Sequence, residues 1–183
     1  TATLRWAMFP DGKLSQAFVA QDAATIAARA GLARASLREA RFLIVDETGV
    51  GRDHPFSREK LSPVLAFYRE PDFAAARTRA TELLRYQGAG HSIGLHTRTG
   101  DRATALGLTL PVARVIVNQA HCFATGGSFD NALPFSLSMG CGTWGGNSIS
   151  DNLNYQHFLN ITRVVHPLPR ERVREPGEDE LFG

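Results

Sequence analysis

Short apolar runs alternate with amphipathic segments along residues 22–117 of the chain. The apolar runs are rich in β-branched and aromatic residues, which is typical of buried strands. They predict four strands, at residues 42–45, 64–68, 93–97 and 113–117. The amphipathic segments have apolar residues at helical spacing. They predict three helices, at residues 22–31, 71–88 and 101–106.

The helix boundaries follow from capping residues. Asp22 is a candidate N-cap, and Gly31 suits the left-handed position that follows a helix. Pro71 is expected at the first position of the second helix, where its missing N–H costs nothing, and Gly88 is expected to end that helix.

The order strand, helix, strand, helix, strand favours a parallel sheet, because parallel neighbours need crossover connections. The expected fold class is therefore α/β, with helices packed on the faces of the sheet. After Asn118 the chain is rich in glycine and aromatic residues, and long structured loops of this kind are usually functional. A final strand is predicted at residues 158–165, and prolines and charges dominate from Pro167 onward.

Composition excludes several classes of partner. The chain has 183 residues, of which 43% are hydrophobic, and its net charge of +2 comes from 20 basic and 18 acidic residues spread along it. We therefore expect neither a nucleic acid nor a membrane partner. No apolar run approaches the roughly 20 residues of a spanning helix, and Thr1–Pro10 lacks the pattern of a secretory signal, so we expect a cytoplasmic protein. Cys122 and Cys141 are expected to be free thiols, although one pair remains possible.

General motif rules identify no chemistry. No glycine fingerprint for a dinucleotide follows a strand, and no Gly-x-Ser-x-Gly elbow occurs. No metal site is expected, because the adjacent His121 and Cys122 would point apart on an extended backbone. Taken singly, Glu59 is an ordinary solvated charge, and His91 and His96 are polar residues of a strand. Cys141 is a small packed thiol, and Cys122 also has a structural role.

Three blocks together carry a family resemblance. Residues 54–65 read HPFSREKLSPVL, residues 88–92 read GAGHS, and residues 140–150 read GCGTWGGNSIS, followed by Asn160-Ile161-Thr162. In this order and spacing, from about Gly12 to Val165, they resemble the C-terminal portion of the coenzyme A-acylating branch of the aldehyde dehydrogenase superfamily. Leu61 takes the position that is phenylalanine in many hydrolytic members.

The resemblance implies a mechanism. A cysteine thiolate attacks the aldehyde, the resulting hemithioacetal gives hydride to NAD or NADP, and coenzyme A resolves the enzyme thioester. Neither cysteine of this chain matches the nucleophile, which is expected before Thr1 together with the main dinucleotide-binding fold. Glu59, with Leu61 beside it, is expected to hold the nicotinamide ribose, and His91 is a candidate catalytic polar group near the acyl site.

The resemblance also implies an organisation and partners. Residues 1–143 would belong to the catalytic region, residues 144–166 would form a pocket wall and an oligomerisation strand, and residues 167–183 would be a charged tail. The partners would be a small aldehyde, coenzyme A and further copies of the same protein. Residues 118–127, together with the ending at residues 178–183, are closer to members that act on sulfoacetaldehyde or other small functionalised aldehydes than to those that act on acetaldehyde.

Three alternatives stay open. The protein could be a hydrolytic aldehyde dehydrogenase that needs no coenzyme A. It could be a non-catalytic, truncated module that keeps the oligomer interface. Alternatively, Cys122 could be a nucleophile with His121 or His91 as its base.

Overall fold

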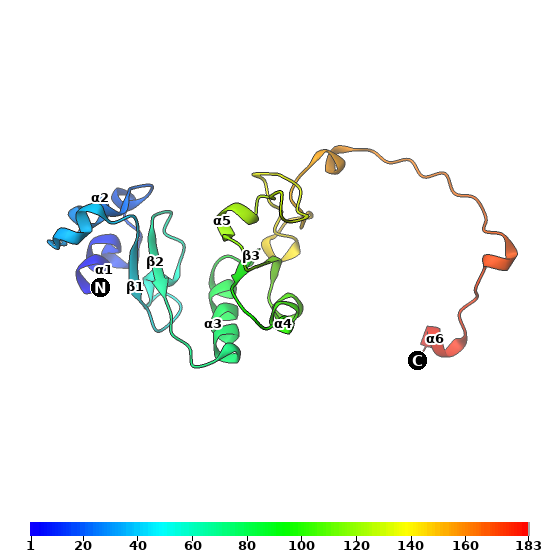
Figure 1. Cartoon of the computed structure of the whole chain (residues 1–183), viewed down its shortest axis with the longest axis horizontal. Coiled ribbons are helices and arrows are strands. Elements are labelled where there is room, and N and C mark those ends of the chain that lie inside the picture. Colours follow the sequence, from blue (N-terminus) through cyan, green and yellow to red (C-terminus); the bar gives the residue numbers. More distant parts are fainter. Residues whose placement is uncertain (183) are drawn as a thin grey trace.

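A computed structural model describes residues 1–182, so Gly183, the last residue of the predicted tail, lies outside the described residues. The chain forms two packed lobes followed by an extended C-terminal segment (Figure 1). The first lobe (residues 1–69) contains α1 (Ala2–Met8), α2 (Ala23–Arg29), β1 (Leu43–Asp46) and β2 (Val64–Phe67). The second lobe (residues 73–158) contains α3 (Phe73–Tyr86), β3 (Gly90–Leu95), α4 (Asp101–Thr109), β4 (Val112–Val117) and α5 (His121–Ala124). A short α6 (Glu178–Phe182) follows in the C-terminal segment.

All four strands predicted up to residue 117 occur, and their pairing is parallel as expected. Leu43 of β1 lies opposite Val64 of β2, and Gly90 of β3 lies opposite Val112 of β4. The expectation of one continuous sheet is wrong for this chain, since the strands form two separate two-stranded sheets. Only β3, α4 and β4 make a strand–helix–strand unit; β1 and β2 are joined by a loop with a 3-10 turn at Pro55–Ser57. Parallel pairs of this size leave edges and faces uncovered.

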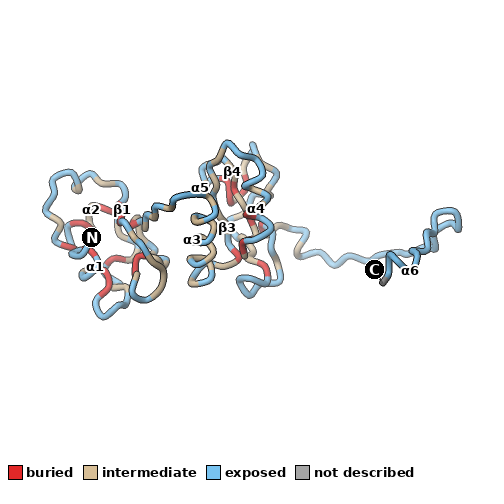
Figure 2. Tube along the Cα trace, turned by 90° about the horizontal axis from the view of Figure 1, so that it is seen from below, coloured by how far each residue is buried: buried red, intermediate tan, exposed pale blue. Residues whose placement is uncertain are grey.

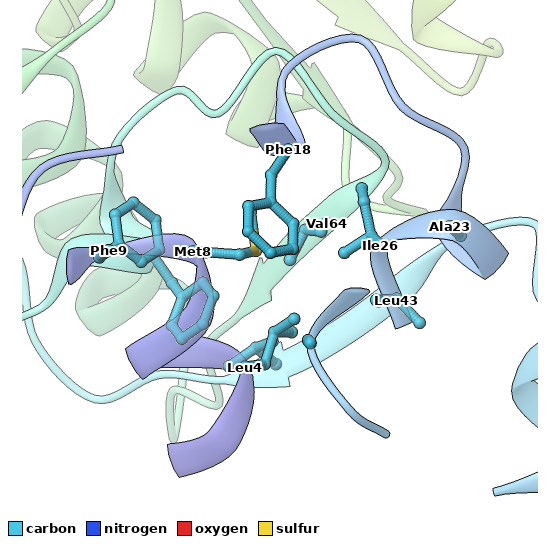
Figure 3. Packing of buried hydrophobic residues seen from close by; sticks show 11 residues of the cluster. Leu4, Met8, Phe9, Phe18, Ala23, Ile26, Leu43 and Val64 are labelled. Atoms are coloured by element: carbon cyan, nitrogen blue, oxygen red, sulfur yellow. The ribbon is translucent and has the colours of Figure 1, made fainter. Parts of the chain in front are cut away.

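The first lobe is organised by α2, whose predicted caps are confirmed. The Asp22 carboxylate accepts a hydrogen bond of 2.8 Å from the Thr25 N–H, and Gly31 has φ +71° after the helix end. Between these caps α2 turns Ile26 into a core that it shares with Met8 and Val64 (Figure 3).

Helix α3, the first element of the second lobe, begins two residues later than predicted. Asp72 is the N-cap of α3, because its carboxylate accepts a 2.8 Å hydrogen bond from the Ala75 N–H, so Pro71 lies before the helix rather than at its first position. The caps decide the boundary because a carboxylate can satisfy an otherwise unpaired N–H of the first turn. Helix α3 then packs Phe73 and Leu84 against the core beside β3 and β4.

The predicted final strand at residues 158–165 is wrong. The chain makes a 3-10 turn at Tyr155–Phe158 and continues without a strand, exposed on all sides (Figure 2). Within the described chain, residues 160–168 make no backbone hydrogen bond. A strand needs a partner for its N–H and C=O groups, and this single chain supplies none there.

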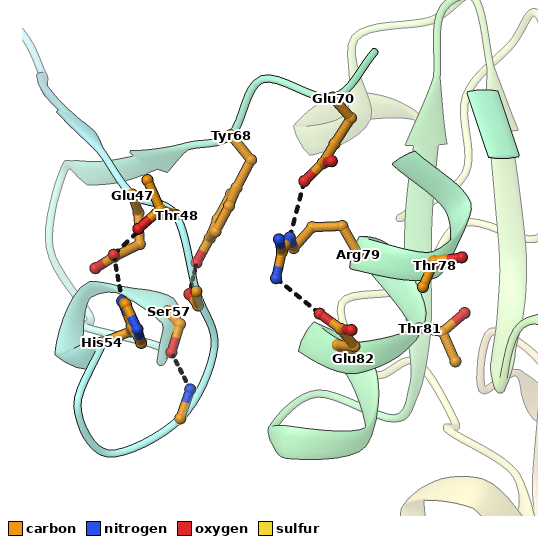
Figure 4. Close-up of polar contacts among 12 residues, drawn as sticks. Glu47, Thr48, His54, Ser57, Tyr68, Glu70, Thr78, Arg79, Thr81 and Glu82 are labelled. Atoms are coloured by element: carbon orange, nitrogen blue, oxygen red, sulfur yellow. Dashed lines mark hydrogen bonds and ion pairs between the residues drawn. The ribbon is translucent and has the colours of Figure 1, made fainter. Parts of the chain in front are cut away.

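A polar layer lies where β1 and β2 end, close to α3 (Figure 4). The Tyr68 hydroxyl donates a 3.0 Å hydrogen bond to the Gly49 carbonyl, and the Arg79 guanidinium lies 5.5 Å from the Tyr68 ring centre. Arg79 also pairs with Glu70 and Glu82. The Tyr68 ring therefore holds the loop after β1 and also touches the second lobe.

The pH dependence of stability should report on Tyr68. Burial, assisted by the charge of Glu47, raises the pKa of Tyr68 to about 12 from an ordinary value of 10. The neutral phenol is thus favoured in the folded chain, so its stabilisation is complete below pH 10 and is lost as the pH rises through about 12. We expect Tyr68→Phe to cost about 1 kcal/mol below pH 10, and this difference to shrink above it. Urea unfolding of both proteins at several pH values tests this; a constant difference to pH 12 contradicts it.

Candidate active site

The loop before β2 presents the Glu59 carboxylate to solvent. The Glu59 N–H donates a 2.8 Å hydrogen bond to the Gln87 side-chain oxygen, just after α3. The carboxylate itself is exposed and has no ion pair or hydrogen bond within residues 1–182. The loop is therefore anchored through its backbone, and the charged group is left available.

Lys60 holds the turn that carries Glu59. Its ammonium donates to the carbonyl oxygens of Phe56 and Arg58 at 2.7 and 2.6 Å. Burial lowers the pKa of Lys60, against the opposing charges of Glu59 and Glu47. A charge is retained in this half-buried position because it satisfies two backbone carbonyls.

Leu61 has an unusual backbone. Its φ is +46°, in the left-handed region that non-glycine residues rarely adopt, and its side chain is 63% exposed. Its carbonyl accepts a 2.8 Å hydrogen bond from the Ala20 N–H, which holds this conformation. Such strained positions are concentrated at binding and catalytic sites.

His91 lies at the start of β3, four residues after Gln87. Its Nδ1 is 2.6 Å from the Ser92 Oγ, and the same oxygen is 2.8 Å from the His121 Nε2. Burial lowers the pKa of His121, and the neighbouring His91 lowers it further. The structure thus joins His91 to a second imidazole from α5, which the sequence treats only as a neighbour of Cys122.

The turn at residues 140–147 docks on the start of β3. Gly90 has φ +90°, and a Cβ atom there would collide with the Cys141 carbonyl oxygen and lie 2.8 Å from the Gly145 nitrogen. The Cys141 N–H donates a 3.0 Å hydrogen bond to the Asn147 side chain, which closes the turn. Glycine at position 90 is therefore a condition for this contact, because only glycine has both the conformation and the space.

Arg114 of β4 holds this turn from beneath. It is 6% exposed, and its guanidinium donates to Asn152 Oδ1 at 2.8 Å, to the Gly140 and Ser150 carbonyls at 3.0 and 3.1 Å, and to the His91 carbonyl at 3.4 Å. Burial lowers the pKa of Arg114. Fixed donors in a fork match several carbonyl oxygens at once. Arg114 is thus a structural clamp, because its guanidinium donates to protein groups on both sides of the contact.

Asn152 extends the clamp. It is fully buried, and its amide group donates to the Thr125 and Pro134 carbonyls at 2.9 and 2.8 Å. Sequence reasoning missed both residues. The available signal was a charged residue at position 114 within the apolar alternation of β4, where every second side chain is buried.

The two cysteines are free thiols, as predicted. Cys122 is exposed, and the nearest polar partner of the Cys141 sulfur is the Met139 carbonyl at 3.9 Å. Within the described chain, neither thiol is hydrogen-bonded to an imidazole. The alternative that makes Cys122 a nucleophile therefore lacks a positioned base, since His121 is engaged with Ser92.

Three further observations bear on binding. A cavity of about 530 Å³ opens beside the docked turn and is lined by Met139, Gly140, Asn147, Ile149 and Leu153 among others. Across residues 1–182, no three histidine, cysteine or carboxylate side chains are grouped so that they could hold a metal ion. None of the described helices combines the length and hydrophobicity that crossing a membrane requires.

Comparison with known proteins identifies the family. No family model matches the chain. Over 182 residues the chain is 58% identical to the acylating sulfoacetaldehyde dehydrogenase of Cupriavidus necator, covering 100% of this chain and 36% of that protein. The chain is homologous to part of the coenzyme A-acylating aldehyde dehydrogenases. It is also 33% identical to the acetylating succinate-semialdehyde dehydrogenase of Clostridium kluyveri, covering 98% of this chain and 38% of the relative.

A solved structure agrees. An acetylating aldehyde dehydrogenase from Geobacillus thermoglucosidasius superposes with a TM-score of 0.80 at 32% identity, over 92% of this chain and 37% of that one. The α/β class predicted from the sequence is therefore confirmed, and so is the homology to part of the acylating aldehyde dehydrogenases. The chain spans little more than a third of the length of the relatives it matches.

The structure brings some predicted residues together and leaves others apart. His91 lies beside Ser92 and His121, and the turn docks on the adjacent Gly90, whereas Glu59 and Leu61 lie on the loop before β2. That loop is bonded to the second lobe through Gln87, four residues before His91. No hydrogen bond joins Glu59 to His91 within the described chain.

Proposed function

We propose that the chain contributes the ribose-binding and acyl-site edge of a longer acylating aldehyde dehydrogenase. That enzyme would oxidise a small aldehyde to an acyl-CoA, using NAD or NADP, with the nucleophilic cysteine supplied by residues before Thr1. The observation that carries the proposal is the docked turn beside His91, formed by the blocks on which the family resemblance rests, in a chain that is 58% identical to an acylating relative over 182 residues. Neither thiol of this chain has a base, which agrees with a nucleophile elsewhere.

The residues present fit a nicotinamide cofactor at Glu59. A carboxylate accepts hydrogen bonds from two neighbouring hydroxyl groups, and the Glu59 carboxylate is exposed and has no competing partner within residues 1–182. When bound, the cofactor would supply the hydride acceptor. In this proposal Glu59 binds the ribose hydroxyls, and Lys60 and Gln87 keep the Glu59 loop in place. The exposed Leu61 side chain packs beside the bound ribose.

His91 would face the reacting acyl group. Its imidazole can accept or donate a hydrogen bond at Nε2 while its Nδ1 is hydrogen-bonded to Ser92. The docked turn and the cavity beside it would form the wall of the acyl site and limit the access of water. The proposal also includes the division of the chain into a catalytic region (residues 1–143), a pocket wall with an oligomerisation segment (residues 144–166) and a charged tail (residues 167–183).

The decisive experiment uses the longer polypeptide that contains this chain. We expect reduction of NAD⁺ or NADP⁺ only when both an aldehyde and coenzyme A are present. Turnover without coenzyme A would replace the proposal with a hydrolytic aldehyde dehydrogenase. A native gene product whose mass corresponds to a start near Thr1 would favour the non-catalytic module.

Glu59→Gln should weaken cofactor binding. Hydrogen bonds to a charged acceptor are worth about 1.5–3 kcal/mol, so we expect the KM for the nicotinamide cofactor to rise roughly tenfold or more. The KM for coenzyme A should change less than about twofold. The exposed Glu39 is the matched control, since Glu39→Gln removes the same charge from the same lobe. Equal effects of the two substitutions would show that Glu59 has no specific role.

The aldehyde proposed as substrate is sulfoacetaldehyde. The support is the 58% identity with a relative named for that substrate, against 33% with one named for succinate semialdehyde. We expect kcat/KM for sulfoacetaldehyde to exceed that for succinate semialdehyde and acetaldehyde. A preference for acetaldehyde would overturn this assignment.

We also propose a cytoplasmic homo-oligomer. Two free thiols suit a reducing compartment. The side chains of Phe158, Ile161 and Val165 are 64–85% exposed, and exposed apolar residues in a row mark contact surfaces. Light scattering on the longer polypeptide should give a multiple of its chain mass, and a monomer would contradict this.

A further inference from the structure

Ser92 stands between two imidazoles that come from distant parts of the chain. Its Oγ lies 2.6 Å from the His91 Nδ1 and 2.8 Å from the His121 Nε2, 29 residues further on. Both distances are within hydrogen-bonding range. The three side chains therefore form one continuous hydrogen-bonded row from the half-buried His121 to the exposed His91.

The row couples the proton positions of the two rings. A serine hydroxyl has one proton to donate, and a neutral imidazole has one N–H and one bare nitrogen. If Ser92 donates to one ring, the other ring must donate to Ser92. The hydroxyl oxygen could also accept from both rings at once, but its own proton would then have no acceptor, because within residues 1–182 the Ser92 Oγ bonds only to these two imidazoles. A neutral His121 with its proton on Nε2 therefore favours a bare Nδ1 on a neutral His91.

The packing of His121 selects one of the two arrangements. Its Nδ1 lies against Gly94 of β3, where an added Cβ atom would be only 2.8 Å from that nitrogen. Within residues 1–182 no acceptor is bonded to Nδ1. A proton there would be a donor without a partner in the protein, and unpaired donors are rarer than unpaired acceptors. The proton therefore belongs on Nε2, which donates to Ser92.

We propose that His121 is a positioning residue which, through Ser92, holds neutral His91 with its proton on Nε2. Ser92 then donates to the His91 Nδ1, and the His91 Nε2–H is offered to the acyl site as a hydrogen-bond donor. An oxygen that becomes negative during acyl transfer is the group such a donor would stabilise. The role of the donor rests on the proposed function, whereas the proton positions do not.

The surroundings favour the neutral form of His121. Burial and the neighbouring His91 both lower the pKa of His121. The other titratable groups on the adjoining elements are Cys122 of α5 and Arg114 of β4, whose guanidinium is influenced by Cys141 and Asp151. Arg114 itself donates to the His91 carbonyl at 3.4 Å.

Nitrogen NMR tests the proton positions directly. The longer polypeptide would be labelled with ¹⁵N in its histidine rings, and His91 and His121 assigned by single substitution. At neutral pH we expect a protonated Nε2 and a bare Nδ1 in both rings, and mixed tautomers of His91 in Ser92→Ala. A protonated Nδ1 in His91, or a tautomer unchanged by Ser92→Ala, would overturn the proposal.

Kinetics test the consequence. Ser92→Ala and His121→Phe should each lower kcat roughly tenfold with little change in the KM for the aldehyde, since outright loss of such a donor costs roughly 10²–10³. Ser92→Thr keeps the hydroxyl and should retain activity within about twofold. His96→Asn, on the exposed residue after β3, is the matched control and should have no effect.

The two experiments separate the two proposals. If the longer polypeptide has no acylating activity but the NMR pattern is found, the proposed function fails and the coupling of the rings stands. If Ser92→Thr loses activity as Ser92→Ala does, the hydroxyl has no positioning role. Should His121→Phe not fold, the comparison of alanine with threonine at position 92 still decides.

Discussion

Gly90→Ala is expected to detach the turn at residues 140–147 from β3. The new Cβ atom would collide with the Cys141 carbonyl oxygen and lie 2.8 Å from the Gly145 nitrogen, at a residue with φ +90°. Overpacking and backbone strain each cost about 1–3 kcal/mol, so we expect the free energy of unfolding to fall by about 3 kcal/mol or more. Urea unfolding of the longer polypeptide measures the loss, and hydrogen exchange of the turn amides locates it.

Gly88→Ala is the control for backbone strain alone. Gly88 has φ +106°, but an added Cβ atom there would meet no atom within 4 Å. We expect it to cost only about 1–2 kcal/mol and to leave the turn protected. Equal losses for the two substitutions would mean that the docked turn contributes nothing to stability.

Arg114→Met should have a comparably large effect. It removes the donors that satisfy Asn152 Oδ1 and the Gly140 and Ser150 carbonyls. Each buried polar group left unpaired costs about 1–3 kcal/mol, so we expect a loss on the order of 4 kcal/mol, with faster hydrogen exchange over residues 125–153. Activity should fall with it, because Arg114 also reaches the backbone of His91.

Arg102→Met provides the matched control. Arg102 is exposed and only stacks on the Phe73 ring, 4.9 Å from its centre. Its replacement should cost about 1 kcal/mol or less. If Arg114→Met is as mild as Arg102→Met, the buried guanidinium is not the clamp that its hydrogen bonds indicate.

Local patterns predicted the helices and strands well where the residues that define an element lie within the element or next to it. Asp22 and Gly31 bound α2 as expected, because a cap needs only residues close in sequence. The start of α3 was misplaced because Pro71 was expected to be the first helical residue, whereas the Asp72 carboxylate, one residue later, caps the helix. The strand at residues 158–165 failed for a different reason. Its apolar side chains are suitable, but no second strand is available in this chain.

The site was predictable only in part. Glu59, Leu61 and His91 were named through the family blocks, and the structure gives the first an anchored loop and the last a hydrogen-bonded partner. Arg114 and Asn152 were missed because their partners are 18 to 38 residues away. The role of Ser92 was invisible for the same reason, since His121 approaches it only after α5 is folded beside β3.

The sequence by itself determined the α/β class, the caps of α2 and the likeness to part of the acylating aldehyde dehydrogenases, because each depends on residue types at short spacing or on ordered blocks. Only the tertiary structure decided that the strands form two separate pairs and that Arg114 clamps the turn onto β3. It also decided that Ser92 joins His91 to His121. These contacts depend on which backbone atoms and side chains meet after folding. The spacing of residues along the chain does not reveal which of them will be close in space.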